Sequence, residues 1–307
     1  MRLSPALNYR SLWSMGALTI LALTLEGCGG GGGASGCNAP AATVATIANT
    51  SPLTYYHYGR FTVTGTGLST AGITLSDSTG KCQNASIQTG TTATDTTVQF
   101  QCALLGSGTI SLDIKDACGA VLGTQTFSVP DPKVRIATTM GNMDVLLNPT
   151  AAPATVQNFM RYVTYTDVNN PTGYYSNTIF HRVINNFMIQ GGGFTTGPVQ
   201  KGTFAAIALE SNNGLKNLRG TIAMARTSAA NSATSQFFIN HVNNASLDYT
   251  ATNASPNGYA VFGTIVASDT TSLGTLDAIA GVATHTVGTY ANVPVTDVTI
   301  TSVTQIQ

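Results

Sequence analysis

The chain has 307 residues, which is enough for two domains with separate cores. Only 8% of the residues are charged, and 13 Lys and Arg balance 13 Asp and Glu. This balance gives no electrostatic basis for nucleic-acid binding, so no nucleic-acid partner is expected. It also argues against disorder caused by charge repulsion.

The N-terminus has the composition of an export signal. Arg2 and Arg10 supply positive charge, and a mostly apolar run covers residues 12–25. Because this run is short for a bilayer span, we expect a signal peptide over residues 1–27. A plain secretory signal or an uncleaved anchor is the alternative.

The end of this segment resembles the lipidation site of bacterial lipoproteins. Glu26, Gly27 and Cys28 precede five glycines, and Cys28 would become the acylated first residue of the mature chain. Glu26 departs from the small or apolar residue usual at its position. Residues 28–36 suit a flexible tether. We therefore expect an exported lipoprotein, membrane-anchored and facing the periplasm or cell surface, with the outer membrane favoured because Gly29 is no inner-membrane retention signal.

Four further cysteines lie in the first half of the chain, at Cys37, Cys82, Cys102 and Cys118. An even number in an exported domain predicts two disulfides, and three connectivities are open. No C-x2-C pair and no neighbouring histidine suggest a zinc site, so no metal is expected.

Residues 37–129 are expected to form a domain of short strands. Apolar and polar residues alternate over 60–64, 97–101, 109–114 and 124–129. Alternation with period two, interrupted by Gly, Ser and Asp, indicates antiparallel strands with one buried face. An immunoglobulin-like β-sandwich fits this pattern and length.

A short boundary with two prolines, residues 129–132, precedes a second domain expected over 133–307. Strand-like runs at 134–138 and 144–147 flank Gly141-Asn142, which is a signal for a tight hairpin turn. This domain therefore opens with a predicted β-hairpin.

Two helices are expected in the second domain. Apolar residues recur at helical spacing from Val156 to Val163, after Thr150 as a candidate cap and Pro153 in the first turn. A weaker helix is expected near 273–279. The remaining strand-like runs cover residues 178–183, 187–191, 221–225, 237–241, 260–265 and 295–306.

The most informative motifs of the chain lie in this domain. Residues 180–194 read FHRVINNFMIQGGGF, and they place one cation beside aromatic rings, a thioether and an amide. Residues 224–226 read MAR, and residues 235–240 read SQFFIN. From Lys133 to Gln307 the chain resembles the cyclophilins, peptidyl-prolyl cis-trans isomerases, and bacterial members in particular. The resemblance implies a mainly β fold, an antiparallel β-barrel with two covering helices.

The chemistry that such a motif supports needs no nucleophile and no cofactor. Amide resonance sets a barrier of about 18–20 kcal/mol to rotation, so X-Pro bonds exchange slowly between cis and trans. A site accelerates the rotation if it binds the twisted amide better than the planar forms. The proline nitrogen becomes a better hydrogen-bond acceptor when it is twisted, so a fixed guanidinium stabilises that state. The resemblance implies that Arg182 is this catalytic group.

The resemblance also implies which residues bind the substrate. Phe187, Met188 and Phe238 would form the pocket for the proline ring, and Leu247 would lie at its rim. Tyr259 takes the place of the pocket histidine that is usual in the family.

Polar groups would hold the peptide on either side of this pocket. The resemblance implies that Gln190 and Gln236 bond the peptide and help orient the catalytic arginine. Ala225 and Arg226 would meet the backbone of the residue before proline. The predicted substrate-binding residues are Phe187, Met188, Gln190, Ala225, Arg226, Gln236, Phe238, Leu247 and Tyr259.

The predicted function is acceleration of X-Pro rotation in unfolded or extracytoplasmic proteins, with proline-containing polypeptides as partners. His181 is not expected to be a catalytic base, because isomerisation transfers no proton. One alternative is a proline-peptide binding or chaperone module with little turnover, favoured only by Ser246, which stands where a rim aromatic is common. Another is an adhesin that uses residues 37–129.

Overall fold

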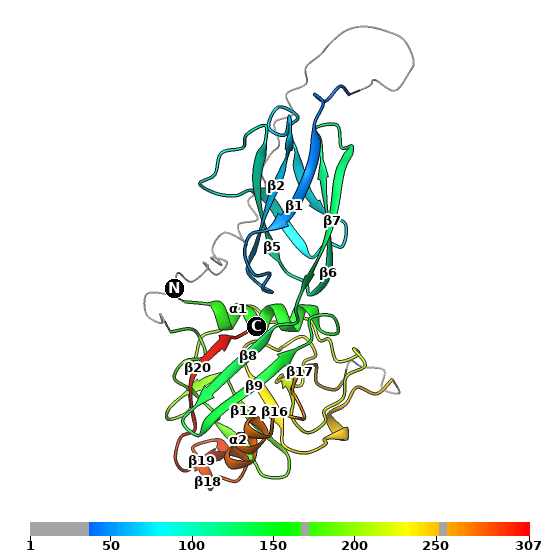
Figure 1. Cartoon of the computed structure of the whole chain (residues 1–307). Coiled ribbons are helices and arrows are strands. Elements are labelled where there is room, and N and C mark those ends of the chain that lie inside the picture. Colours follow the sequence, from blue (N-terminus) through cyan, green and yellow to red (C-terminus); the bar gives the residue numbers. More distant parts are fainter. Residues whose placement is uncertain (1–36, 167–171, 252–256) are drawn as a thin grey trace. The chain divides into compact units, whose positions relative to one another are not determined.

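The computed structural model describes residues 37–166, 172–251 and 257–307 (Figure 1). The predicted signal peptide, the lipidation site at Cys28 and the tether lie outside the described residues. The chain divides into two compact units, and the main body of the second unit begins at Ser128. No helix in the described part of the chain is long and apolar enough to cross a membrane.

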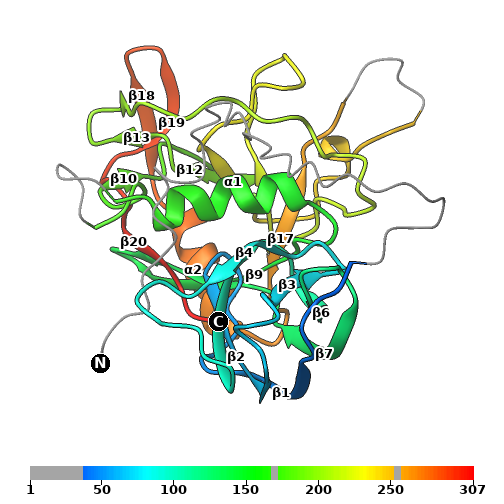
Figure 2. The same cartoon turned by 90° about the horizontal axis from the view of Figure 1, so that it is seen from above.

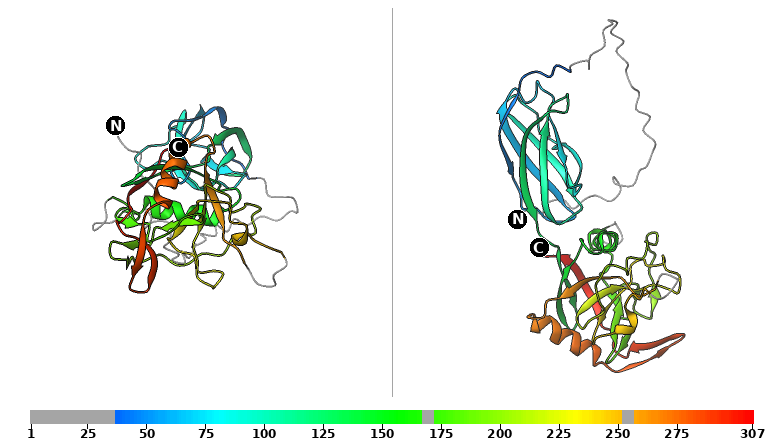
Figure 3. Two further views of the ribbon diagram at one scale, coloured as in Figure 1. Left: turned by 90° about the horizontal axis from the view of Figure 1, so that it is seen from below. Right: turned by 90° about the vertical axis from the view of Figure 1, so that its right-hand side faces the viewer.

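The first unit has two antiparallel sheets within residues 37–129, which Figure 3 shows stacked face to face. One sheet has the order β1-β2-β5-β4 and the other has the order β3-β6-β7. This is the strand order of a seven-stranded, constant-type immunoglobulin sandwich. The strands are β1 (Thr43–Asn49), β2 (Tyr58–Thr66), β3 (Thr74–Asp77), β4 (Cys82–Ile87), β5 (Thr97–Leu104), β6 (Gly108–Lys115) and β7 (Val121–Val129).

Alternation along these strands builds the core of the sandwich. Phe61 and Val63 of β2 are fully buried, and Phe100 of β5 is buried opposite Phe61 in the strand register. Ile110 and Leu112 of β6 are fully buried in the other sheet. Since successive side chains of a strand point to opposite faces, the intervening Thr and Gln residues remain more accessible.

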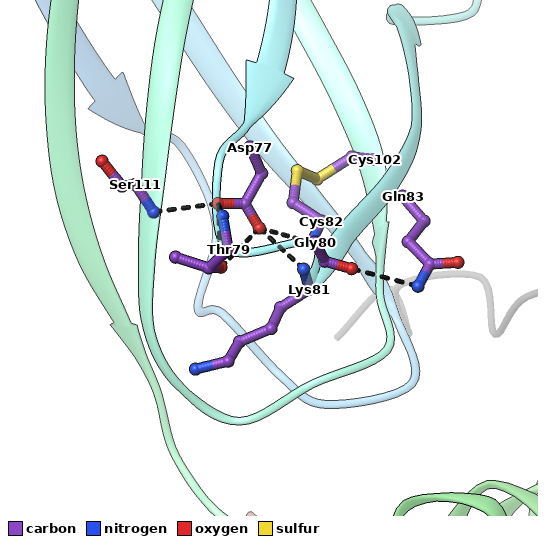
Figure 4. Close-up of a disulfide and its surroundings, with 8 residues drawn as sticks. All are labelled: Asp77, Thr79, Gly80, Lys81, Cys82, Gln83, Cys102 and Ser111. Atoms are coloured by element: carbon purple, nitrogen blue, oxygen red, sulfur yellow. Dashed lines mark hydrogen bonds between the residues drawn. A yellow bond between two sulfur atoms is a disulfide. The ribbon is translucent and has the colours of Figure 1, made fainter.

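Two disulfides cross-link the sandwich, which resolves the connectivity that the sequence left open. Cys37 is bonded to Cys118, and Cys82 of β4 is bonded to Cys102 of the neighbouring β5. The Asp77 carboxylate organises the turn that leads into Cys82 (Figure 4). It accepts hydrogen bonds from the backbone N–H groups of Cys82 and Ser111, at 2.9 and 3.0 Å.

The second unit has a curled antiparallel sheet. Its described strands follow the order β10-β20-β8-β9-β17-β15-β16-β12-β11. The outermost strands, β10 and β11, are separated in the chain only by Phe180 and His181, so this bend joins the two ends of the sheet. The strands are β8 (Lys133–Thr138), β9 (Gly141–Leu147), β10 (Thr178–Ile179), β11 (Arg182–Ile184), β12 (Met188–Gly191), β15 (Thr221–Met224), β16 (Phe237–Asn240), β17 (Val261–Ile265) and β20 (Thr299–Gln305).

Smaller elements flank this sheet. Two helices lie at opposite ends of the curled sheet, and Figure 2 shows α1 side-on as it crosses one of these ends. Two hairpins, β13–β14 and β18–β19, were not predicted. The bounds are α1 (Pro153–Thr164), α2 (Thr270–Ala280), a 3-10 turn η2 (Ala245–Leu247), β13 (Phe194–Thr195), β14 (Val199–Gln200), β18 (Thr284–Val287) and β19 (Tyr290–Pro294).

Three local predictions were wrong. The strand-like run predicted over 178–183 is divided at residues 180–181 into β10 and β11, which lie at the two edges of the sheet. The opening hairpin pairs Thr138 with Gly141, so its turn is at residues 139–140 and Gly141 already belongs to β9. Gly141 has φ of 128°, a conformation that favours glycine. The glycine is therefore required by the first residue of β9, and the turn predicted at 141–142 lies two residues earlier in the chain.

Helix α1 is not capped by Thr150 either. Ala152 precedes the helix without a side-chain cap. The Glu210 carboxylate accepts from the backbone N–H groups of Ala154 and Thr155 at 3.0 and 2.8 Å. An acidic group from a distant segment therefore satisfies the free donors of the first helical turn.

Aromatic rings fill the core of the second unit. The ring of Phe159 on α1 lies 5.3 Å from that of Tyr175, 5.7 Å from Phe237 and 5.2 Å from Phe262. All four side chains are almost fully buried. Phe237 therefore belongs to the core, as its alternation with Phe238 predicts.

Candidate active site

Three neighbouring strands bring the main site residues side by side. In the register of β11, β12 and β16, Arg182 is opposite Gln190, and Gln190 is opposite Phe238. His181 and Val183, on either side of Arg182, are buried, whereas Arg182 is half-buried. Strand alternation therefore turns the arginine away from the core.

A cavity of about 120 Å³ opens beside these residues. Met188 and Phe238 are buried in its wall, and Phe187, Leu247 and Tyr259 pack against them. The cavity brings together the predicted catalytic arginine and every predicted substrate-binding residue except Gln236. Its lining is Arg182, Phe187, Met188, Gln190, Ala225, Arg226, Phe238, Leu247 and Tyr259.

Gln236 lies immediately behind this lining. Its side-chain oxygen accepts from Gln190 Nε2 at 3.0 Å, and its backbone oxygen accepts from the N–H of Ala225 at 2.9 Å. Gly193 leaves the space that the Gln236 side chain occupies, because a Cβ at residue 193 would collide with it. Gln190 and Gln236 therefore hold one another in place beside the cavity.

The two arginines of the site differ in how they are held. Among the residues that the structure describes, Arg182 has no hydrogen-bond or ion-pair partner for its guanidinium. Arg226 donates from Nε to the Gly258 oxygen at 2.9 Å, and its guanidinium lies 4.9 Å from the centre of the Tyr259 ring. Arg226 thus braces one wall, while the donors of Arg182 are available to a ligand. Neither glutamine bonds Arg182 within the described residues, so their predicted orienting role has no hydrogen bond behind it here.

The rim of the cavity depends on buried asparagines that sequence reasoning missed. Asn244 donates from Nδ2 to the Phe187 oxygen at 2.8 Å and to Asn240 Oδ1 at 2.7 Å. Asn217 donates from Nδ2 to the Leu247 oxygen at 3.0 Å. Asn240 is the signal that could have revealed this network, because it is a polar residue within an otherwise apolar strand.

His181 is close to the site but outside the lining of this cavity. Burial lowers the pKa of His181 to about 4, and the positive charge of Arg182 adds to the effect. The imidazole is therefore neutral near pH 7, and its ring centre lies 4.4 Å from that of the tilted Phe194 ring.

Comparison with known proteins identifies what this chain is similar to. The family described as "Cyclophilin type peptidyl-prolyl cis-trans isomerase/CLD" matches residues 133–305. Peptidyl-prolyl cis-trans isomerase B of Escherichia coli K12 is 51% identical over 153 residues, 50% of this chain and 87% of that protein. Peptidyl-prolyl cis-trans isomerase A of Dickeya dadantii is 46% identical over 169 residues, 55% of this chain and 82% of that protein. A crystal structure of a Cryptosporidium parvum cyclophilin aligns with a TM-score of 0.44 at 24% identity, covering 58% of this chain and 98% of that one.

Proposed function

Because this chain belongs to the cyclophilin-type peptidyl-prolyl cis-trans isomerases, we propose that Arg182 is the group that stabilises the twisted amide. The chain is a peptidyl-prolyl cis-trans isomerase, and its substrates are proline-containing polypeptides. The observation that carries the proposal is the combination of an apolar cavity and one cation without a partner in the described chain. A structural arginine would normally have such a partner.

The physical task of the site is to favour a state that exists only during rotation. At the midpoint the X-Pro amide loses its resonance, and the lone pair of the proline nitrogen becomes available. A hydrogen bond from Arg182 to that nitrogen is stronger in the twisted state than in either planar state. Differential binding of this kind lowers the barrier without a covalent step.

The apolar cavity supplies the second requirement, which is to hold the proline ring while its neighbour turns. Met188 and Phe238 are 2% and 4% exposed, and they give the ring an almost dry surface. Phe187 and Leu247 border the same cavity from the rim. A partly dry site also strengthens the hydrogen bond from the arginine.

Polar groups along the edge would fix the peptide backbone. Gln190 and Gln236 keep donor and acceptor capacity beyond their mutual hydrogen bond, since each amide can make several. Ala225 and Arg226 lie where β15 ends, at the border of the cavity. They would meet the residue that precedes proline, while Tyr259 braces Arg226.

The cellular setting is also a proposal. We infer an exported protein with a signal peptide over 1–27, a lipid anchor at Cys28 and two domains over 37–129 and 133–307, with the outer membrane favoured. The two disulfides are compatible with export. The clients would then be unfolded or extracytoplasmic polypeptides.

One pair of measurements tests the mechanism. Exchange spectroscopy on a proline tetrapeptide should show that the whole chain accelerates rotation, and that Arg182→Ala loses most of this acceleration. The same variant should still bind the peptide, because the apolar cavity is intact. Slow exchange in the wild-type protein with retained binding would instead indicate a binding module.

A further inference from the structure

A second cavity adjoins the proposed proline pocket. It has a volume of about 400 Å³, compared with about 120 Å³ for the proline pocket. Arg182 and Gln190 line both cavities, so the two spaces share a wall. The far side of the second cavity is formed by residues 289–292 of the β18–β19 hairpin, which none of the predictions of site residues included.

Aromatic rings form one side of this second cavity. The tilted rings of His181 and Phe194 have centres 4.4 Å apart, and Phe194 meets Tyr290 edge to face at 5.2 Å. The first two rings are buried, whereas Tyr290 is 37% exposed. A row of three rings in the cavity lining thus ends in Tyr290, whose side chain is partly exposed to solvent and available to a ligand ring.

The remaining lining of this cavity leaves the face of one guanidinium for a ring to stack on. None of the described residues that line this cavity carries a carboxylate, and its polar groups are a guanidinium, amides and hydroxyls. His181 contributes no charge near pH 7, because burial lowers its pKa to about 4. An aromatic ring can stack on Tyr290 and on the flat face of the Arg182 guanidinium.

Stacking also leaves the proposed catalytic hydrogen bond intact. The N–H donors of a guanidinium lie in its plane, so a ring on its face leaves them free for the proline nitrogen. A carboxylate would instead take two of these donors in a bidentate pair and compete with the substrate amide. An aromatic side chain in this cavity is therefore compatible with the proposed catalysis, whereas an acidic one would compete with it.

We propose that this second cavity is a subsite for an aromatic side chain that lies near the proline of the client polypeptide. The inference rests on the proposed function, because it assumes that the proline enters the neighbouring pocket. It adds a preference among clients, set by Tyr290, to an activity that needs only the proline.

The test uses the whole chain and tetrapeptides with one proline, in which a flanking position is Ala, Leu, Asp or Tyr. Dissociation constants are measured by titration and KM by exchange kinetics. At one flanking position Tyr should bind roughly three- to tenfold more tightly than Ala, the range expected for an aromatic pair. Leu should gain less than Tyr, and Asp should turn over more slowly than Ala, because its carboxylate would take donors of Arg182.

Variants of the hairpin connect this preference to the cavity. Tyr290→Ala should reduce the ratio of Tyr to Ala affinities to about one, and Tyr290→Phe should keep it. Tyr290→Leu, which preserves apolar volume, should lose the preference for Tyr over Leu even if the alanine variant folds poorly. His285→Ala is the matched control, because His285 is exposed on the same hairpin and does not line the cavity.

The possible failures are distinguishable. Equal binding of Tyr and Leu peptides, strongest binding of Asp peptides, or a preference that survives Tyr290→Ala would each overturn the subsite. A wild-type chain that shows the Tyr290-dependent preference but does not accelerate rotation would support the subsite and count against the proposed mechanism. Unchanged turnover in Arg182→Ala would refute that mechanism, whereas the subsite is judged by the dissociation constants of the Tyr290 variants, in which Arg182 is intact.

Discussion

The two units of this chain are stabilised by different means. The first is cross-linked by Cys37–Cys118 and Cys82–Cys102, whereas the sequence contains no cysteine after Cys118. The second relies on packed rings around Phe159. The covalent cross-links therefore lie in one unit and the isomerase domain in the other. An oxidising or reducing environment should change the stability of the first unit alone.

The units also differ in how they treat a charged group. Burial disfavours the charge of Asp77, but hydrogen bonds, the strongest of them from Cys82, lower its pKa overall. This carboxylate is saturated with donors from its own turn. Arg182 has no such partner in the described chain. The charge that organises the turn is satisfied internally, whereas the charge that we propose to act on the substrate is not.

Reduction of the disulfides should produce the largest difference in unfolding temperature between the two units. Each bridge typically contributes about 2–4 kcal/mol, so loss of both should lower the unfolding temperature of the first unit by many degrees. Calorimetry with and without a reductant measures this shift. Isomerase activity should persist, and a parallel loss of activity would show that the units are not independent.

Phe159→Ala should destabilise the second unit and leave the stability of the first unit unchanged. Removal of a buried phenylalanine costs about 3–5 kcal/mol, and here it opens a space between Tyr175, Phe237 and Phe262. The unfolding transition of the second unit should fall while that of the first stays fixed. Phe61→Ala is the matched control, because it should shift only the first transition.

Arg182→Ala should lower the rate of catalysis without changing the unfolding temperature of either unit. A hydrogen bond to a charged donor is worth about 1.5–3 kcal/mol, so kcat/KM on a proline tetrapeptide should fall at least roughly tenfold. Arg182→Lys should recover only part of the loss, since an ammonium lacks the planar fork. Full activity in a folded Arg182→Ala protein would remove the basis of the mechanism.

Acid should weaken the second unit through His181. Burial holds its pKa at about 4 in the folded state, and an exposed histidine titrates near 6.5, so the unfolded chain binds the proton first. Stability is therefore complete above about pH 6.5 and falls as the pH decreases toward about 4, by about 2 kcal/mol at pH 5. Denaturation at pH 7.5 and 5 measures the change. His181→Gln should remove most of this dependence of stability on pH, and His285→Gln should leave it unchanged.

The sequence predicted the alternating strands better than the half-exposed ones. Both β2 and β5 alternate cleanly between buried and accessible residues, and both were predicted. By contrast, β1 has no fully buried residue, and the short β3 and the largely exposed β4 gave equally weak signals, so all three were missed. Local alternation reports burial on one face, and a strand at the margin of the core has little of it.

The candidate site was predicted where a motif carries it and missed where folding assembles it. The residues at 182–190 are neighbours in sequence, and resemblance to the cyclophilins located them. Glu210 at the start of α1, Asn217 beneath the rim and Tyr290 on the hairpin come from distant segments. Nothing local distinguishes them, because their roles depend on partners brought close only by the tertiary structure.

The sheet of the second unit can be completed only when β20, near the end of the chain, has been synthesised. Thr178 of β10 pairs with Ile300 of β20, and β20 also pairs along β8. Until residues 299–305 have been synthesised, β8 and β10 both have an open edge, and the segment that carries Arg182 is not closed into the barrel. Such distant pairings are formed late in folding. A chain truncated before Thr299 should therefore be both inactive and prone to self-association, so the isomerase would become active only after β20 has joined the sheet.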